Sequence, residues 1–176
     1  MYFELNIAGS LFRKEVLFKS LKFTAINLDR YCSDQDIEAC VIELDPTYVN
    51  ISMLAIYRSP VGKINNFITQ LDIILQTIHN PRWDLIYGYI NVNYLNDNDR
   101  KSQLDAVLNS YSLCSTGNFP TRINSDSSSV IDNIFIDISK TDDYETITIM
   151  NGLSDYDAQF IILNNSEQAI WVSVLF

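Results

Sequence analysis

Few side chains in this sequence combine a reactive type with a spacing that suits catalysis or metal binding. Asp155 and Asp157 lie two residues apart and could hold a divalent cation weakly, although carboxylates on a loop are more often simply solvated. His79 is the only histidine, and it lies beside Asn80-Pro81, where a helix is expected to end. Its interaction with the helix dipole explains it without catalysis. We therefore treat Asp155 as a weak metal ligand and expect no histidine base.

The composition suits one globular domain, because the chain has 176 residues and a hydrophobic content of 47%. No apolar run approaches the ~20 residues that a membrane span needs, and the first residues lack the pattern of a secretory signal. We therefore predict an intracellular protein, cytoplasmic or nuclear, with no membrane partner. The cysteines are odd in number and have no CxxC spacing, which argues against a disulfide framework and a zinc site. We expect reduced thiols at Cys32, Cys40 and Cys114.

The charge balance argues against a nucleic-acid partner. The chain carries 22 acidic and 12 basic side chains, a net charge of −10. Such a field repels a phosphate polyanion unless a basic patch overrides it. Lys and Arg are scattered, and the most basic segment is the short stretch 13–22.

Hydrophobic periodicity alternates between strand and helix, as in a layered α/β protein. Residues 37–44 and 49–57 are expected strands, and the turn Asp45-Pro46-Thr47 between them predicts an antiparallel hairpin. Apolar side chains at spacings of three and four over residues 64–78 predict a helix.

The rest of the chain continues the alternation. We expect a short strand over 83–87 and a second helix over 99–110, which the polar cluster 96–99 opens. The polar segment 117–129 predicts an exposed loop, followed by strands over 130–138, 144–150 and 158–163. Residues 169–176 are apolar enough for an additional strand or a sticky tail.

Five short stretches between residues 57 and 155 carry a family pattern. They are Tyr57-Arg58-Ser59-Pro60, Gly88-Tyr89-Ile90-Asn91, Phe119-Pro120-Thr121-Arg122, Ile131-Asp132-Asn133-Ile134 and Gly152-Leu153-Ser154-Asp155. Their order and spacing resemble the endonuclease domain of non-LTR (LINE-type) retrotransposons. Those domains belong to the endonuclease/exonuclease/phosphatase superfamily, which includes apurinic endonucleases and pancreatic deoxyribonuclease.

This resemblance implies an α/β (α+β) fold, a two-sheet β-sandwich flanked by helices, with the active site at one end of the sandwich. It covers roughly the C-terminal two thirds of the family domain. We therefore expect residues 1–163 to form a single deoxyribonuclease-like domain that is incomplete at the N-terminus. Residues 164–176 are expected to be an apolar tail outside the family.

The resemblance also implies a Mg²⁺-dependent phosphodiester hydrolase that cuts DNA, and it assigns roles to positions. Asn91, Asp132 and Asp155 retain family residues: a donor to phosphate oxygen, an orienting carboxylate and a terminal catalytic Asp. Tyr89 replaces the Asp that activates water, and Tyr156 replaces the His that contacts the scissile phosphate. Tyr57 and Arg58 match substrate-binding positions, with packing as the alternative role for each.

These substitutions predict a catalytically inactive domain. The phenol of Tyr89 is a poor base, because tyrosine in model peptides has a pKa near 10. In the family, a Glu in the N-terminal part chiefly holds the metal, and this chain begins too late to contain that part. Losing the base, this ligand and the His should leave no useful turnover. Mg²⁺ and DNA are thus implied by the family, but productive metal binding is not expected and the charge disfavours DNA.

A noncatalytic protein-interaction module is the alternative. Truncation should leave unpaired sheet edges and uncovered apolar surface, and the tail is β-prone and uncharged. Self-association through an exposed edge or the C-terminal tail follows from this hypothesis. We expect Tyr89 and Tyr156 to approach each other across the catalytic cleft that the resemblance implies, with Asp132 or Asp155 accepting a phenolic hydrogen bond.

Overall fold

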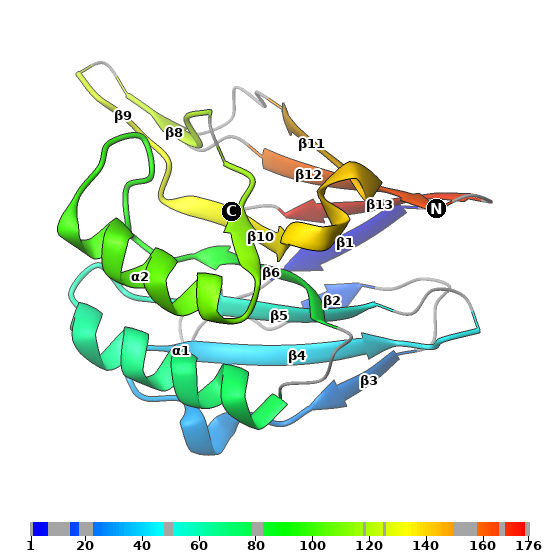
Figure 1. Ribbon diagram of the computed structural model, residues 1–176, viewed down its shortest axis with the longest axis horizontal. Helices are drawn as coiled ribbons and strands as arrows, with labels where there is room; N and C mark the ends of the chain where they lie inside the picture. Colours follow the sequence, from blue (N-terminus) through cyan, green and yellow to red (C-terminus); the bar gives the residue numbers. More distant parts are fainter. Residues whose placement is uncertain are drawn as a thin grey trace.

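Two β-sheets face each other, and two helices cover the outer face of the larger sheet (Figure 1). The computed structural model describes residues 2–6, 15–17, 23–47, 51–78, 83–117, 119–124, 126–149, 158–165 and 168–174. No helix among these residues is long and apolar enough to cross a membrane.

The larger sheet has six strands in the order β3-β4-β5-β6-β10-β7. Their bounds are β3 Phe23–Ile26, β4 Glu38–Leu44, β5 Ser52–Tyr57, β6 Trp83–Tyr89, β10 Asp132–Asp137 and β7 Leu113–Ser115. Neighbouring strands are antiparallel except β5 and β6, which are parallel. The helix α1 (Ile64–Ile78) forms the crossover between this parallel pair, because parallel neighbours need such a connection.

The smaller sheet has five strands in the order β11-β12-β13-β1-β2. Their bounds are β11 Tyr144–Ile149, β12 Ala158–Asn165, β13 Gln168–Val174, β1 Tyr2–Asn6 and β2 Glu15–Leu17. The apolar C-terminal segment therefore forms the additional strand that its composition allowed. Over Trp171–Val174, β13 pairs with β12 on one side and with β1 on the other.

Shorter elements complete the described chain. The second helix, α2 (Asp99–Ser110), has the bounds expected from the sequence. Within the predicted loop 117–129, β8 (Arg122–Ile123) and β9 (Ser128–Ser129) form a small hairpin. Two 3₁₀ helices, η1 (Asp29–Tyr31) and η2 (Ile138–Asp143), precede β4 and β11.

The strands β5 and β10 of the larger sheet are buried on both faces. Successive side chains of a strand point to opposite sides, so each strand contributes to the packing on both faces. On one face, Leu54 and Ile86 pack against Phe67 and Leu71 of α1. On the other face, strands β4, β5, β6 and β10 contribute a second apolar cluster that includes Ile161 of β12. The core of the molecule is thus two layers, one under the helices and one between the sheets.

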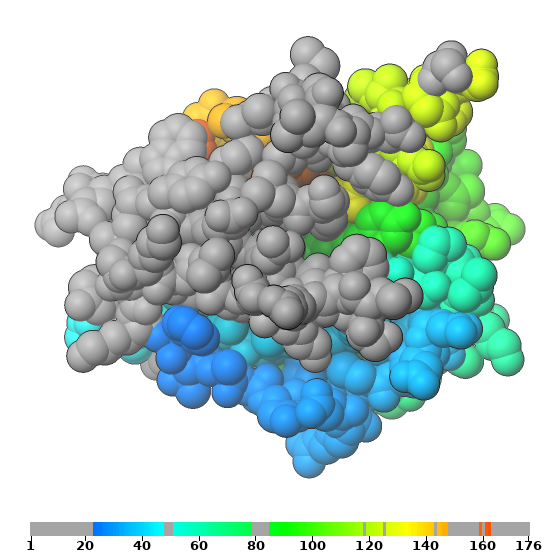
Figure 2. Space-filling model, turned by 180° about the vertical axis from the view of Figure 1, so that it is seen from behind, coloured from blue at the N-terminus to red at the C-terminus, as the bar shows by residue number. Residues whose placement is uncertain are grey.

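The fold class, the hairpin and both helices are confirmed, with strand bounds that differ by a few residues from those expected. The hydrophobic pattern did not predict β1, β2, β3 and β7, which are three to five residues long. Of these, β3 and β7 are the two outer strands of the larger sheet, and the side chains of β3 are exposed apart from the half-buried Ile26. Figure 2 shows this blue segment at the surface. The division into a domain over 1–163 and a tail outside the family stays a prediction.

Candidate functional site

Four side chains stand in one row across the end of the larger sheet. The strand register pairs Glu38 with Tyr57, Tyr57 with Tyr89, and Tyr89 with Asp132. Directly paired residues of neighbouring strands project from the same face of a sheet. This face points towards the smaller sheet, because Tyr87, two residues before Tyr89, belongs to the cluster between the sheets. We call these four residues the end row.

The two tyrosines of the end row stack on each other. The ring centroids of Tyr57 and Tyr89 lie 5.6 Å apart, with 14° between the ring planes. Both side chains are half-buried. Tyr89 is therefore the packing partner of Tyr57. A contact between Tyr57 and a phosphate stays a prediction. The expected approach of Tyr89 to Tyr156 stays untested, because Tyr156 lies outside the described residues, as does Asp155.

Asp132, at the end of the row, is fully buried at 0% exposure. Neither of its carboxylate oxygens has a well-formed hydrogen bond within the described part of the chain. Burial raises its pKa to about 7, while the nearby Thr121 hydroxyl and the Arg122 charge act in the opposite direction. This carboxyl group is thus poised to carry a proton near neutral pH.

Arg58 follows β5 directly and is only 2% exposed. Its guanidinium donates from Nε to Ile90 O, from Nη2 to Asn91 O and from Nη1 to Gly62 O, each at 2.8 Å. Arg58 therefore fastens the segment after β6 to the turn before α1. This geometry favours the packing role over a role in substrate binding, since each nitrogen already donates to a backbone carbonyl.

The side chain of Asn91 is hydrogen-bonded to the backbone of Arg58. Its side-chain Nδ2 donates to Arg58 O at 2.7 Å, and its backbone has a φ of 53°, a left-handed conformation that Asn tolerates better than most residues. The Arg58 amide donates to Tyr89 O at 2.8 Å. The amide expected to donate to a phosphate oxygen thus donates to the protein backbone.

Gly88 lies where strands β5 and β6 pack closely against each other. A Cβ atom at this position would overlap the carbonyl oxygen of Ile56 on the neighbouring parallel strand. Glycine is therefore required to bring β5 and β6 together immediately before the Tyr57 and Tyr89 pair.

Thr121 plays a similar structural part for Asp132. It is 0% exposed, and its Oγ1 accepts hydrogen bonds from the amides of Ile131 and Asp132 at 3.3 and 3.4 Å. The Thr of the Phe119-Pro120-Thr121-Arg122 stretch thus holds the start of β10 in place.

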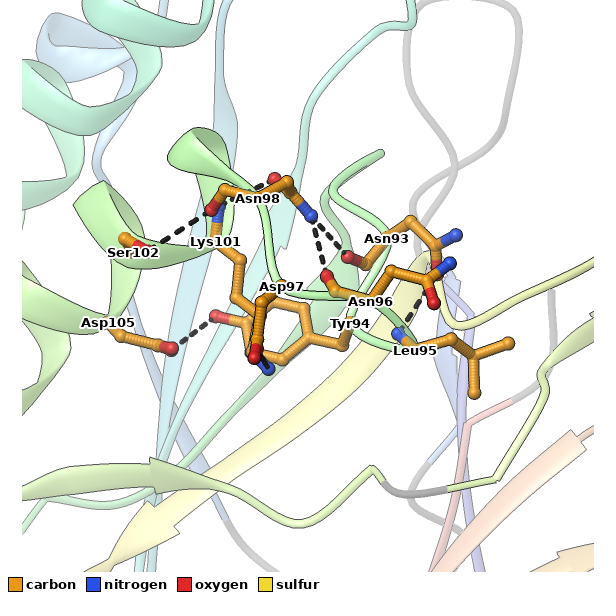
Figure 3. A network of polar contacts seen from close by, with 9 residues as sticks. All are labelled: Asn93, Tyr94, Leu95, Asn96, Asp97, Asn98, Lys101, Ser102 and Asp105. Atoms are coloured by element: carbon orange, nitrogen blue, oxygen red, sulfur yellow. Dashed lines mark hydrogen bonds and ion pairs between the residues drawn. The ribbon is translucent and has the colours of Figure 1, made fainter.

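A polar network holds the segment between β6 and α2 (Figure 3). Asn98 caps α2 by accepting from Lys101 N at 2.9 Å, and its Nδ2 donates to Asn93 O and Asn96 O at 2.9 Å. The hydroxyl of Tyr94 donates to Asp105 Oδ1 at 2.8 Å. These bonds fix the chain that leaves the site.

Comparison with known proteins places this arrangement in a known fold. No protein-family model and no curated protein matches the sequence. Among solved structures, the endonuclease domain of TRAS1, a telomere-specific non-LTR retrotransposon, is similar with a TM-score of 0.68 and 17% identity. The match covers 86% of this chain and 73% of that domain. This chain has the endonuclease/exonuclease/phosphatase fold.

Two bacterial proteins of the endonuclease/exonuclease/phosphatase family are also similar. One, from Bacteroides thetaiotaomicron, has a TM-score of 0.47 and 13% identity, and the match covers 74% of this chain and 57% of that one. The other, from Leptotrichia buccalis, has a TM-score of 0.48 and 12% identity, covering 88% and 67%. The expected fold is confirmed, whereas the 86% coverage in the TRAS1 match does not show an N-terminal truncation.

The endonuclease/exonuclease/phosphatase fold implies a divalent metal, and the described residues do not fit one. No three His, Cys, Asp or Glu side chains lie together among them. Glu38 and Asp132 stand at opposite ends of the end row. Three strand spacings separate them by about 14 Å, too far to share one ion. Asp155, the weak metal candidate, lies outside the described residues.

Glu38 is the member of the end row that sequence reasoning did not assign to the site, because it matches no family motif. The predicted hairpin put Glu38 on a strand beside residues 49–57, but a turn centred on Pro46 would set it opposite Leu54, whereas the observed register sets it opposite Tyr57. Register, rather than a motif, identifies this residue.

Proposed function

We propose that this chain is a retrotransposon-derived endonuclease-like domain that does not hydrolyse phosphodiesters. The likeness to the TRAS1 endonuclease domain supports the ancestry. The observation that carries the loss of activity is the stack of Tyr89 on Tyr57. It puts a packed aromatic ring at the position where the family resemblance implies a water-activating carboxylate.

The other groups of the site support the same conclusion. Hydrolysis of a phosphodiester needs a base for the attacking water and donors for the developing negative charge. Arg58 and Asn91 are the donors beside Tyr89, and both donate to backbone carbonyls. A general base is typically worth about 10² to 10⁴ in rate, and a catalytic metal contributes several kcal/mol more. Losing both leaves no useful turnover.

A plasmid-nicking assay tests this proposal. The purified chain, incubated with supercoiled DNA and Mg²⁺, is expected to release no more nicked circles than buffer does. Asp155→Ala and the exposed Asp142→Ala serve as paired variants. Mg²⁺-dependent nicking that Asp155→Ala abolishes and Asp142→Ala preserves would overturn the proposal. Nicking that all three proteins share equally would instead identify a contaminating nuclease.

We propose further that DNA is not a partner of this chain. The net charge of −10 opposes association with a phosphate polyanion, and Arg58 is buried. Electrophoretic mobility of labelled duplex should therefore be unchanged at low ionic strength. A shift that weakens steeply with added salt would contradict this expectation.

A noncatalytic protein-interaction role is the second candidate, and the outer strand β3 favours it. Phe23 is 40% exposed, and the strand Phe23–Ile26 carries no charged side chain or proline that would discourage pairing with another chain. Sedimentation should show self-association that Ala25→Lys weakens and Val61→Lys, at an exposed site away from the strand, preserves. A monomer across the accessible concentration range would exclude this role.

A further inference from the structure

Two buried polar side chains meet between the sheets without partners for their acceptor oxygens. Asp132 lies on β10 of the larger sheet and Gln159 on β12 of the smaller sheet, and both are 0% exposed. Among the described residues, Asp132 Oδ1 and Oδ2 and Gln159 Oε1 have no hydrogen-bond partner. The two residues are neighbours, because Gln159 Nε2 donates to the backbone oxygen of Asp132 at 3.5 Å.

Three acceptor oxygens without a donor are costly in a dry interior. The amide nitrogen of Gln159 donates to the Asp132 backbone carbonyl, and neither carboxylate oxygen of Asp132 receives a hydrogen bond from it. A proton on Asp132 would reduce this cost, since a protonated carboxyl group is neutral and gains one O–H donor. The Oε1 atom of Gln159 is then the neighbouring acceptor that still lacks a donor.

We propose that Asp132 is a proton-binding site, and that its protonated carboxyl donates to Gln159 and thereby holds the two sheets together at this end of the sandwich. Raising the pH removes the proton and loosens this contact. This contact is independent of whether the domain hydrolyses phosphodiesters, since it packs β10 against β12.

The described groups around Asp132 leave it without a compensating close cation. Tyr89 lies directly across on β6, and Tyr87, two residues earlier, has a buried hydroxyl. Cys114 of β7 borders the same apolar cluster, and β12 carries no titratable side chain over Ala158–Asn165. The Thr121 hydroxyl and the Arg122 charge both lower the pKa of Asp132, and burial outweighs them.

The direction of the pH effect follows from the raised pKa. Burial shifts the pKa of Asp132 from its ordinary 3.8 to about 7. Below the ordinary value, native and unfolded chains both bind the proton. Between the two values only the native chain binds it, so the unfolding equilibrium constant rises about tenfold per pH unit. Above the native pKa the unfolding equilibrium constant stops rising, after a total increase of roughly a thousandfold.

Urea unfolding between pH 4.5 and 8.5 tests this inference. The Asp132→Asn variant stays neutral and keeps a donor. Relative to this variant, the unfolding equilibrium constant of the wild-type protein should rise about tenfold per pH unit and level off near neutral pH. The exposed Asp142→Asn variant should follow the wild-type curve. Parallel curves for wild type and Asp132→Asn would overturn the proposal.

A second measurement needs no Asp132 variant. Carbon-13 NMR of wild-type protein labelled at aspartate carboxyl carbons should show one carboxyl titrating near neutral pH. If every carboxyl titrates in the acidic range, the proposal fails. Stability that rises with added Na⁺ or Mg²⁺ and ignores pH would also overturn it, by identifying a cation in place of the proton.

The part played by Gln159 is tested by a double-mutant cycle with Asp132→Leu and Gln159→Met. The coupling between the two side chains should be about five- to tenfold in the unfolding equilibrium at pH 5, and it should vanish at pH 8.5. Equal coupling at both pH values would show that the protonated carboxyl does not donate to Gln159.

Discussion

Tyr57 and Tyr89 stack with their ring centroids 5.6 Å apart and 14° between the ring planes. The two residues end the parallel strands β5 and β6, so the pair closes the site end of the sheet. Because the contact joins strands that α1 separates in sequence, it stabilises the crossover as well as filling the space where a catalytic carboxylate is expected.

A double-mutant cycle measures this stack. Tyr57→Leu and Tyr89→Leu should each lower the free energy of unfolding, and together they should cost less than their sum by about 0.5–1.5 kcal/mol, because either change alone already breaks the ring contact. Urea denaturation of the four proteins provides the comparison. Tyr89→Phe should retain most of the coupling, since it keeps the ring. Strict additivity would show that the rings contribute no more than independent burial.

Replacing Arg58 by Lys should destabilise the protein by about 2–4 kcal/mol, although it preserves the charge. An ammonium group cannot reproduce the fork that reaches Ile90 O, Asn91 O and Gly62 O. Arg30→Lys, at an exposed position in η1, is the matched control and should change stability by less than about 0.5 kcal/mol. Unfolding curves that coincide for wild type and Arg58→Lys would show that the three guanidinium hydrogen bonds contribute little to stability.

Gly88→Ala should separate β5 from β6 and cost about 3 kcal/mol, because the added methyl group meets the backbone oxygen of Ile56 rather than a side chain that could move. Thermal unfolding followed by circular dichroism checks this cost. Nearly unchanged stability would mean that the strands tolerate a side chain here and that the glycine serves another purpose.

Asn98 has two separable structural contributions, and substitutions should distinguish them. Asn98→Ala removes the α2 cap and the bonds to Asn93 O and Asn96 O, at a cost of roughly 1–2 kcal/mol. Asn98→Asp keeps an acceptor for the helix and loses the amide donors, so it should recover part of that loss. If Asn98→Asp is as unstable as Asn98→Ala, the bonds to the segment 93–96, rather than the cap, dominate.

The sequence was sufficient for the elements that are long and strongly patterned. The apolar stripe over Ile64–Ile78 and the polar start of Asp99–Ser110 gave both helices, since periodicity and capping are local properties. Strands β3 and β7 were not predicted, because three or four residues are too few to show a hydrophobic alternation. Their pairing with β4 and β10 depends on residues far away in the chain.

For the candidate site, the sequence by itself determined which side chains are present: a phenol at Tyr89, an amide at Asn91 and a carboxylate at Asp132. Only the tertiary structure decided their partners. It stacked Tyr89 on Tyr57, bound the Asn91 amide to Arg58 O and buried the Asp132 carboxylate oxygens without a hydrogen-bond partner among the described residues. The physical reason is that hydrogen bonds and burial depend on strand register and sheet packing, which join residues that no local pattern connects.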